Sequence, residues 1–183
     1  MKKLDIILAI ICGLAVSWIA ADFFKKYWLI FFIVLPVLSV IGLWLVDLIG
    51  RKYLFVHQVG KFVLAGAFAD VVDIKVFQFL FLFIPFPLPL KAVSFIVATF
   101  VKYFSDKHWT FEKHEREDMH KEMAKFFMVA MVGLFINVIL FYFLGKIKIG
   151  IPAKLWVELS IILAAIGAGT WNFLGYKFIV FKK

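Results

Sequence analysis

Six apolar stretches, each about as long as a lipid bilayer is thick, divide this chain and restrict what it can fold into. They cover residues 4–21, 28–49, 62–83, 88–104, 126–144 and 152–174. A helix of about 20 apolar residues crosses the roughly 30 Å hydrocarbon core of a bilayer, and 64% of the 183 residues are apolar. The sequence therefore predicts an all-α integral membrane protein with six transmembrane helices, and it argues against a soluble domain.

The first apolar stretch follows a basic start, "MKKLD", as the core of a secretory signal peptide does. A cleavage site near Ala20 and Ala21 would need a small residue where the chain has Ile19. The second apolar stretch also begins after only a few residues. We therefore expect the first stretch to be a retained anchor, with a signal peptide as the alternative.

The lysines and arginines are distributed unevenly between the predicted loops. With the N-terminus inside, 14 of the 21 lie on the cytoplasmic side and six on the outer side. The positive-inside rule then predicts a multi-pass protein of the plasma membrane with both termini in the cytoplasm. The formal net charge of +9 is explained by this topology and by contact with anionic lipids, so nucleic acid is not an expected partner.

An internal repeat relates the last four stretches in pairs. "KFVLAGAFADVVDIKVFQFLF" from Lys61 aligns without gaps with "KFFMVAMVGLFINVILFYFLG" from Lys125, and "KYFSDKHWTFEK" from Lys102 aligns with "NFLGYKFIVFKK" from Asn172. Each unit has two helices and an aromatic, basic ending. We predict two parallel two-helix repeats that form a four-helix core over residues 58–183, preceded by an N-terminal hairpin over residues 1–57. The alternative is that two membrane hairpins resemble each other by chance.

Charged side chains interrupt the third stretch at mid-membrane depth. Asp70 and Asp73 share one helical face, about 13 and 18 Å beyond Lys61 along a helix axis, whereas Lys75 is turned about 160° from Asp73. The repeat sets Asn137 opposite Asp73, so we expect both to line one polar cavity that binds substrate. The alternative is a hydrogen bond that fixes packing only. We expect Lys75 to extend outward or to pair with Glu158.

The cytoplasmic ends of the repeats combine lysines with aromatic rings. Ammonium groups there suit a lipid phosphate and rings suit a sugar face, although an ordinary interfacial belt has the same composition. The candidate binding residues are Lys102, Tyr103, Lys107, Trp109, Asn172 and Lys177.

Small residues four apart predict close helix packing. The pairs are Ala65 with Ala69, and Ala165 with Gly169. We expect each pair to form a packing seam between helices.

Recognised catalytic motifs are missing from the sequence. It contains no phosphate-binding loop, nucleophile elbow or H-E-x-x-H helix, and the histidines at His114 and His120 are too far apart for a helical metal pair. We expect no enzymatic activity, no metal and no cofactor.

The doubled pattern resembles the GtrA-like family of small membrane proteins, and also the membrane part of some prokaryotic dolichyl-phosphate mannose synthases. The segments that carry the resemblance are "KFVLAGAFADVVD", "KYFSDKHWTF" and "NFLGYKFIVF". They fall within residues 58–183, and Lys102 stands where the family pattern has an asparagine, as at Asn172.

The resemblance implies a role in cell-surface polysaccharide or glycan synthesis. Its main implication is the translocation of a polyprenyl-phosphate-linked monosaccharide across the membrane. The alternatives are a noncatalytic anchor for a glycosyltransferase, and a small proton-coupled exporter that uses Asp73. The expected partners are the sugar lipid and membrane lipids, with a glycosyltransferase or a second copy of the chain as further candidates.

Overall fold

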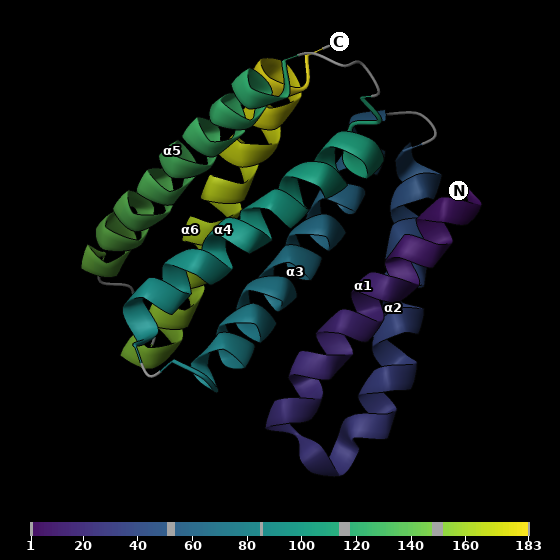
Figure 1. Cartoon of the computed structure of the whole chain (residues 1–183), viewed down its shortest axis with the longest axis vertical. Helices are drawn as coiled ribbons and strands as arrows, with labels where there is room; N and C mark the ends of the chain where they lie inside the picture. The colour runs from purple at the N-terminus through teal and green to yellow at the C-terminus, as the bar shows by residue number, and fades with distance from the viewer. Residues whose placement is uncertain (1, 51–53, 85, 114–117, 148–151, 183) are drawn as a thin grey trace. The chain divides into compact units, whose positions relative to one another are not determined.

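Six long α-helices form the part of the chain that the structure describes, residues 2–50, 54–84, 86–113, 118–147 and 152–182 of a computed structural model. They are α1 (Lys3–Phe23), α2 (Trp28–Gly50), α3 (Leu54–Phe81), α4 (Pro87–Ser105), α5 (Met119–Lys146) and α6 (Ala153–Gly175) (Figure 1). A short 3-10 turn, Lys25–Tyr27, joins α1 to α2. The described residues include no strand, so the all-α prediction is confirmed.

Five of these helices, α1, α2, α4, α5 and α6, are long and apolar enough to cross a membrane. The exception, α3, has 28 residues, about 42 Å of helix, but it carries Lys61, Asp70, Asp73 and Lys75. It packs against α1, α2 and α4. The predicted multi-pass membrane protein is confirmed, and α3 is the helix whose charges require partners within the protein.

The chain divides into two compact units, Met1–His114 with α1 to α4 and Glu115–Lys183 with α5 and α6. The hairpin of α1 and α2 thus belongs to the same unit as the first repeat. The predicted boundary between residues 57 and 58 and the parallel relation of the two repeats stay predictions.

Each repeat ends in the same unusual backbone turn. Helix α4 continues into a π-helical turn, η2 (Asp106–Thr110), and α6 into another, η3 (Tyr176–Val180). The amide of Phe111 donates to the carbonyl of Asp106 at 2.8 Å, and that of Phe181 to Tyr176 at 2.7 Å. These positions match in the alignment of the repeat endings. Since π-helical turns are rare, their recurrence supports the internal repeat.

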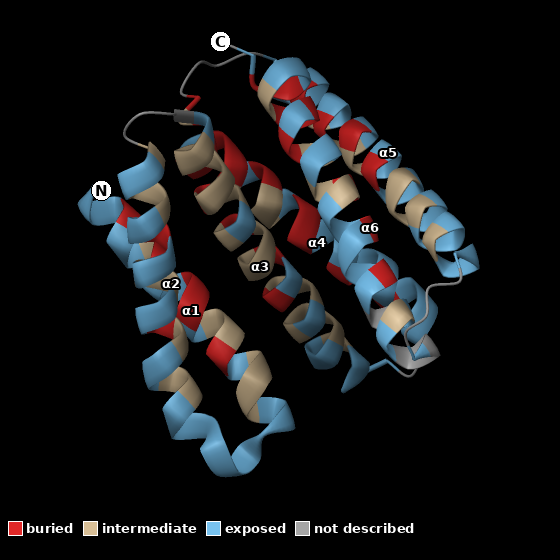
Figure 2. Ribbon diagram, turned by 180° about the vertical axis from the view of Figure 1, so that it is seen from behind, coloured by how far each residue is buried: buried red, intermediate tan, exposed pale blue. Residues whose placement is uncertain are grey.

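The predicted packing seam is correct on α3 and wrong by one residue on α6. Ala65 and Ala69 are buried, as expected. On α6, however, Ala165 is exposed and a side chain at Gly169 would meet nothing within 4 Å, while Ala164 and Ala168 are the buried residues. Figure 2 shows this pattern of buried stripes with exposed outer faces on the helices.

Helices α1 and α2 approach each other closely at a glycine. A Cβ atom at Gly13 would lie 2.4 Å from the Cα of Pro36 in α2. One turn later, the hydroxyl of Ser17 donates to the carbonyls of Gly13, at 2.7 Å, and Phe31, at 2.8 Å. The hairpin is therefore held by backbone contact and by a buried serine that bridges its two helices.

Candidate functional site

A polar cluster joins α3 to the N-terminal half of α4. The carboxylate of Asp73 accepts a hydrogen bond from Ser94 at 2.6 Å and forms an ion pair with Lys91. Ser94 is fully buried, whereas Lys91 is largely exposed. Asp73 is therefore neutralised and oriented by α4, its neighbour in sequence.

A second polar cluster joins the first half of α3 to the C-terminal end of α4. The ammonium of Lys102 donates to the carbonyl of Phe62 at 2.8 Å and to the carboxylate of Asp106 at 3.2 Å. It also lies 3.8 Å from the centre of the Phe62 ring. Asp106 is fully buried in the π-helical turn and accepts a hydrogen bond from Thr110 at 2.9 Å. The sequence prediction missed Asp106, although its spacing of four residues from Lys102 could have indicated it.

Asp70 lies between these two clusters. A Cβ at Gly66, one turn before Asp70, would be 3.6 Å from the ammonium of Lys102. The charges of Lys102, Asp73 and Lys91 act on Asp70, yet its carboxylate forms no hydrogen bond or ion pair within the described ranges. The side chain is exposed. Asp70 is thus available to a ligand in a way that Asp73 is not.

Two candidate binding residues near the end of α4 prove to be buried. Tyr103 is 1% exposed, and its hydroxyl accepts a hydrogen bond from Lys107 at 3.2 Å. Lys107 is itself 7% exposed. Binding of a lipid phosphate by Lys107 stays a prediction that this position does not favour.

The matching ending of α6 has a different arrangement. Lys177 is half-buried, with its ammonium 5.9 and 5.7 Å from the rings of Phe173 and Phe178. The side-chain amide of Asn172 packs directly against Gly133 of α5. A Cβ atom added at Gly133 would lie 2.1 Å from the Oδ1 atom of Asn172. Asn137 is half-buried on α5. Since Asn137 and Asp73 belong to separate compact units, their shared cavity stays a prediction.

Comparison with known proteins identifies the region that contains these clusters. A family model described as the GtrA/DPMS transmembrane domain matches residues 61–181. The chain belongs to this family. No curated protein and no solved structure matches the chain significantly. Membership links the protein to the handling of polyprenyl-linked sugars in the membrane, and GtrA/DPMS domains are typically noncatalytic.

The hairpin that precedes the GtrA/DPMS domain is attached to it by charge. Every acid of α1 and α2 lies beside a basic side chain of α3. The distances between nitrogen and oxygen atoms are 2.9 Å for Lys61 and Asp5, 2.5 Å for Lys75 and Asp22, and 3.3 Å for His57 and Asp47. Within the described part of this unit, every ionisable residue of α3 except Asp70 thus lies beside an oppositely charged or titratable side chain of another helix.

Lys75 has partners that the sequence did not indicate. Its ammonium pairs with Asp22 and lies 4.5 Å from the centre of the Trp18 ring. Both partners come from α1. The predicted pairing with Glu158 concerns a side chain outside those that the structure describes. Position along α3 alone could not indicate which other helix would supply the acid.

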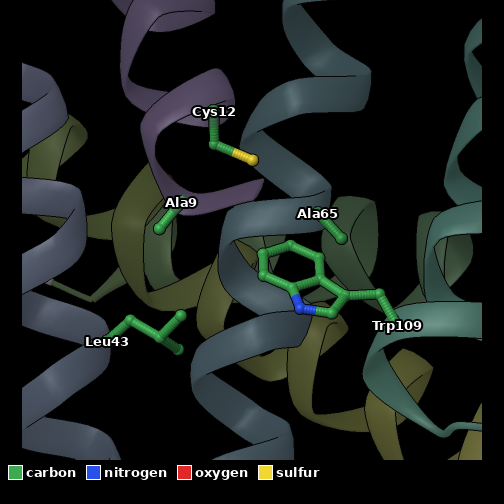
Figure 3. Packing of buried hydrophobic residues seen from close by; sticks show 5 residues of the cluster. All are labelled: Ala9, Cys12, Leu43, Ala65 and Trp109. Atoms are coloured by element: carbon green, nitrogen blue, oxygen red, sulfur yellow. The ribbon is translucent and has the colours of Figure 1, made fainter. Parts of the chain in front are cut away.

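Trp109 contributes to the attachment of the hairpin. Its indole nitrogen donates to Asp5 at 3.0 Å, and the ring is 5% exposed within a cluster that also includes Ala9, Cys12, Leu43 and Ala65 (Figure 3). Helices α1, α2 and α3 and the turn η2 all contribute to this cluster. The sugar-stacking role expected for Trp109 stays a prediction that its burial does not favour.

Glu112, just beyond the turn η2, connects the start of the chain to α3. It accepts hydrogen bonds from Lys2 at 2.7 Å and Lys61 at 3.1 Å. Its φ angle of 49° lies in the left-handed region, which is strained for a side chain other than glycine. The hydrogen bond from Lys2 is the main cause that lowers the pKa of the Glu112 carboxyl, and it also raises the pKa of Lys2.

The lowered pKa of Glu112 predicts a pH-dependent contribution to stability. A carboxyl whose pKa is lower in the folded state stabilises the fold above its ordinary pKa of about 4.3. This stabilisation is lost as the pH falls through the folded-state pKa. We therefore expect Glu112→Gln to lower the unfolding temperature at pH 7 and to have little effect near pH 3. Thermal unfolding of both proteins in detergent across this range tests it, and a difference that is constant with pH would contradict it.

Proposed function

We propose that the protein translocates a polyprenyl-phosphate-linked monosaccharide from the cytoplasmic to the outer leaflet of the plasma membrane. The observation that supports this function most is the series of polar groups along α3 and α4. Lys102 with Asp106, then Asp70, then Asp73 with Lys91 and Ser94 follow one another along the helix pair. From Phe62 to Asp73 the series extends over about 16 Å, half the thickness of the hydrocarbon core.

The chemistry of these groups suits a sugar linked through one phosphate. Ammonium groups such as Lys91 and Lys102 can receive the phosphodiester. Carboxylates and hydroxyls such as Asp73 and Ser94 can exchange hydrogen bonds with sugar hydroxyls. The polar headgroup would move along this series while the isoprenoid tail stays among lipid tails, against helix faces that are rich in exposed apolar residues.

The protein is proposed to act without catalysis and with both termini in the cytoplasm. Noncatalytic translocation agrees with the typical role of the family domain. The orientation rests on the excess of lysine and arginine in the segments assigned to the inside. Consumption of the sugar lipid at the outer leaflet then supplies the direction of net movement.

Replacing Asp73 tests the proposed pathway. Asp73→Asn removes the charge that holds Lys91 and weakens hydrogen bonding to a sugar. We expect translocation to slow by about 10- to 100-fold, since a hydrogen bond to a charged group contributes about 1.5–3 kcal/mol. The measurement is the rate at which a fluorescent polyprenyl-phosphate monosaccharide becomes accessible on the opposite leaflet of liposomes that contain the purified protein.

Asp22→Asn is the matched control for this variant. It makes the same chemical change, but in the pair with Lys75, where the Asp22 side chain is 42% exposed. We expect the control to translocate at the wild-type rate, because exposed ion pairs contribute little. Equal slowing in both variants would indicate a general effect of charge loss and would contradict the assigned pathway.

An anchor for a glycosyltransferase is the second candidate, because the family description also names DPMS. In that function the polar groups of α3 and α4 serve packing, and liposomes with the protein translocate no faster than empty ones. A soluble sugar transferase would then copurify with the wild-type protein and with Asp73→Asn alike.

A further inference from the structure

Among the described residues of its own unit, Asp70 differs from the other ionisable residues of α3 in having no ion-pair or hydrogen-bond partner on another helix. The bases His57, Lys61 and Lys75 lie beside the acids Asp47, Asp5 and Asp22 of the hairpin. Asp73 is paired with Lys91 of α4. An acid at this depth is costly when ionised and without a counter-ion, so residues of this kind mark functional sites in membrane proteins.

We infer that Asp70 is a proton-binding site that controls the passage of an anionic headgroup along α3, an inference that rests on the proposed function. Asp70 is about 12 Å beyond Phe62 and about 5 Å before Asp73 along the helix axis. A headgroup that moves from the Lys102 cluster to the Lys91 cluster must therefore pass it. An ionised Asp70 repels a phosphodiester, whereas a protonated one does not and can donate a hydrogen bond to it.

The charged groups near Asp70 are paired with one another, so none of them neutralises the Asp70 carboxylate. The charged groups whose fields act on it are Lys102 and Lys91 from α4 and Asp73 from α3. Lys102 is compensated by Asp106, and Lys91 by Asp73. In the adjacent turn η2, Lys107 donates to Tyr103, while the acids of α1 and α2 are engaged with the bases of α3. Binding of one proton to Asp70 therefore removes the negative charge that these pairs do not neutralise.

A proton fits the site better than a metal cation. A metal ion of the calcium or magnesium type needs about six oxygen ligands. The described residues contain no group of three or more His, Cys, Asp or Glu side chains that could hold one. A proton needs only one carboxyl oxygen: an O–H bond forms when Asp70 takes a proton from water, and the same proton returns to water when the bond breaks.

Translocation at equal pH on both sides of the liposome tests the inference first. We expect the wild-type rate to rise as the pH falls from 8 to 6, by up to about tenfold per unit while Asp70 is mostly ionised. Asp70→Asn, which is neutral throughout, should translocate at the same rate at both pH values. Asp70→Glu restores a carboxyl and should restore the pH dependence. A wild-type rate that does not change, or a pH dependence that persists in Asp70→Asn, would overturn the inference.

Chemical labelling tests the proton site without any substrate. A hydrophobic carbodiimide reacts with protonated carboxyls in membranes, and mass spectrometry locates the product. We expect labelling of Asp70 that is stronger at pH 6 than at pH 8, with less on Asp73, whose carboxylate is paired with Lys91 and accepts a hydrogen bond from Ser94. Absence of labelling at Asp70, or a preference for Asp73, would contradict the proton site.

The two experiments together distinguish failure of the proton site from failure of the proposed function. If no liposome sample translocates lipid but Asp70 is labelled in this way, the proposed function fails and the proton site stands. Elution of each variant as a single species in detergent establishes that it is folded.

Discussion

Replacing Lys61 with alanine is expected to lower the free energy of unfolding by about 3–5 kcal/mol. Lys61 is 1% exposed and lies 2.9 Å from the 2% exposed carboxylate of Asp5. Its removal leaves a buried carboxylate that keeps, among the described residues, the hydrogen bonds from Trp109 and from the Lys2 backbone amide. An uncompensated buried carboxylate is costly, so the expected loss is much larger than for an exposed ion pair.

The internal repeat supplies the matched control for this variant. Lys125 aligns with Lys61 in the second repeat, but it is exposed. Lys125→Ala should therefore change the unfolding free energy by less than about 0.5 kcal/mol. Denaturant titration of both variants in mixed micelles, followed by tryptophan fluorescence, provides the comparison. The double variant Asp5→Leu/Lys61→Met should recover much of the lost stability, since apolar residues can replace a buried ion pair. Equal effects at Lys61 and Lys125 would show that the buried pair is not what stabilises the unit.

Gly13→Ala is expected to destabilise the hairpin by about 1–3 kcal/mol. The added methyl group would lie 2.4 Å from the Cα and 2.7 Å from the nitrogen of Pro36. Both are backbone atoms, which cannot rotate away as the end of a side chain can. Helices α1 and α2 must then separate, which also lengthens the hydrogen bond from Ser17 to Phe31.

Gly42→Ala is the control for the glycine variant because nothing lies within 4 Å of its added methyl group. It should be neutral or should stabilise α2 by up to about 1 kcal/mol through helix propensity. Thermal unfolding of both variants in the same detergent makes the comparison. If Gly13→Ala unfolded no earlier than Gly42→Ala, the close contact of α1 and α2 would not contribute to stability.

Hydropathy and repeat alignment predicted the helices because both depend on properties local to the sequence. The apolar stretches correspond to six helices, and matched endings such as Phe111 and Phe181 adopt the same π-helical turn. The seam of α6 was wrong because Ala164 with Ala168 has the same spacing as Ala165 with Gly169. Spacing alone cannot distinguish two faces that are about 100° apart.

The partners of the candidate residues were harder to predict than their positions. Trp109 reaches Asp5 across 104 residues of sequence, and Lys75 reaches Asp22 across 53. Such pairs depend on which helices pack together, which the periodicity of one helix does not determine. The sequence could indicate that Asp70 and Asp73 are candidate functional residues, because they are charged side chains in the middle of an apolar segment. Which of them is paired could not, since Lys91 and Ser94 lie beyond the turn that follows α3.

The acids of the hairpin also have a consequence for how the protein enters its membrane. Alone, α3 does not combine the length and apolar composition that the other five helices have. During synthesis α1 and α2 emerge first, and they carry Asp5, Asp22 and Asp47, which lie beside Lys61, Lys75 and His57 of α3. The order of the segments along the chain thus presents Asp5 and Asp22 before the lysines that they pair with in the folded unit. We therefore expect the hairpin to assist the insertion of α3, the helix that carries the candidate pathway.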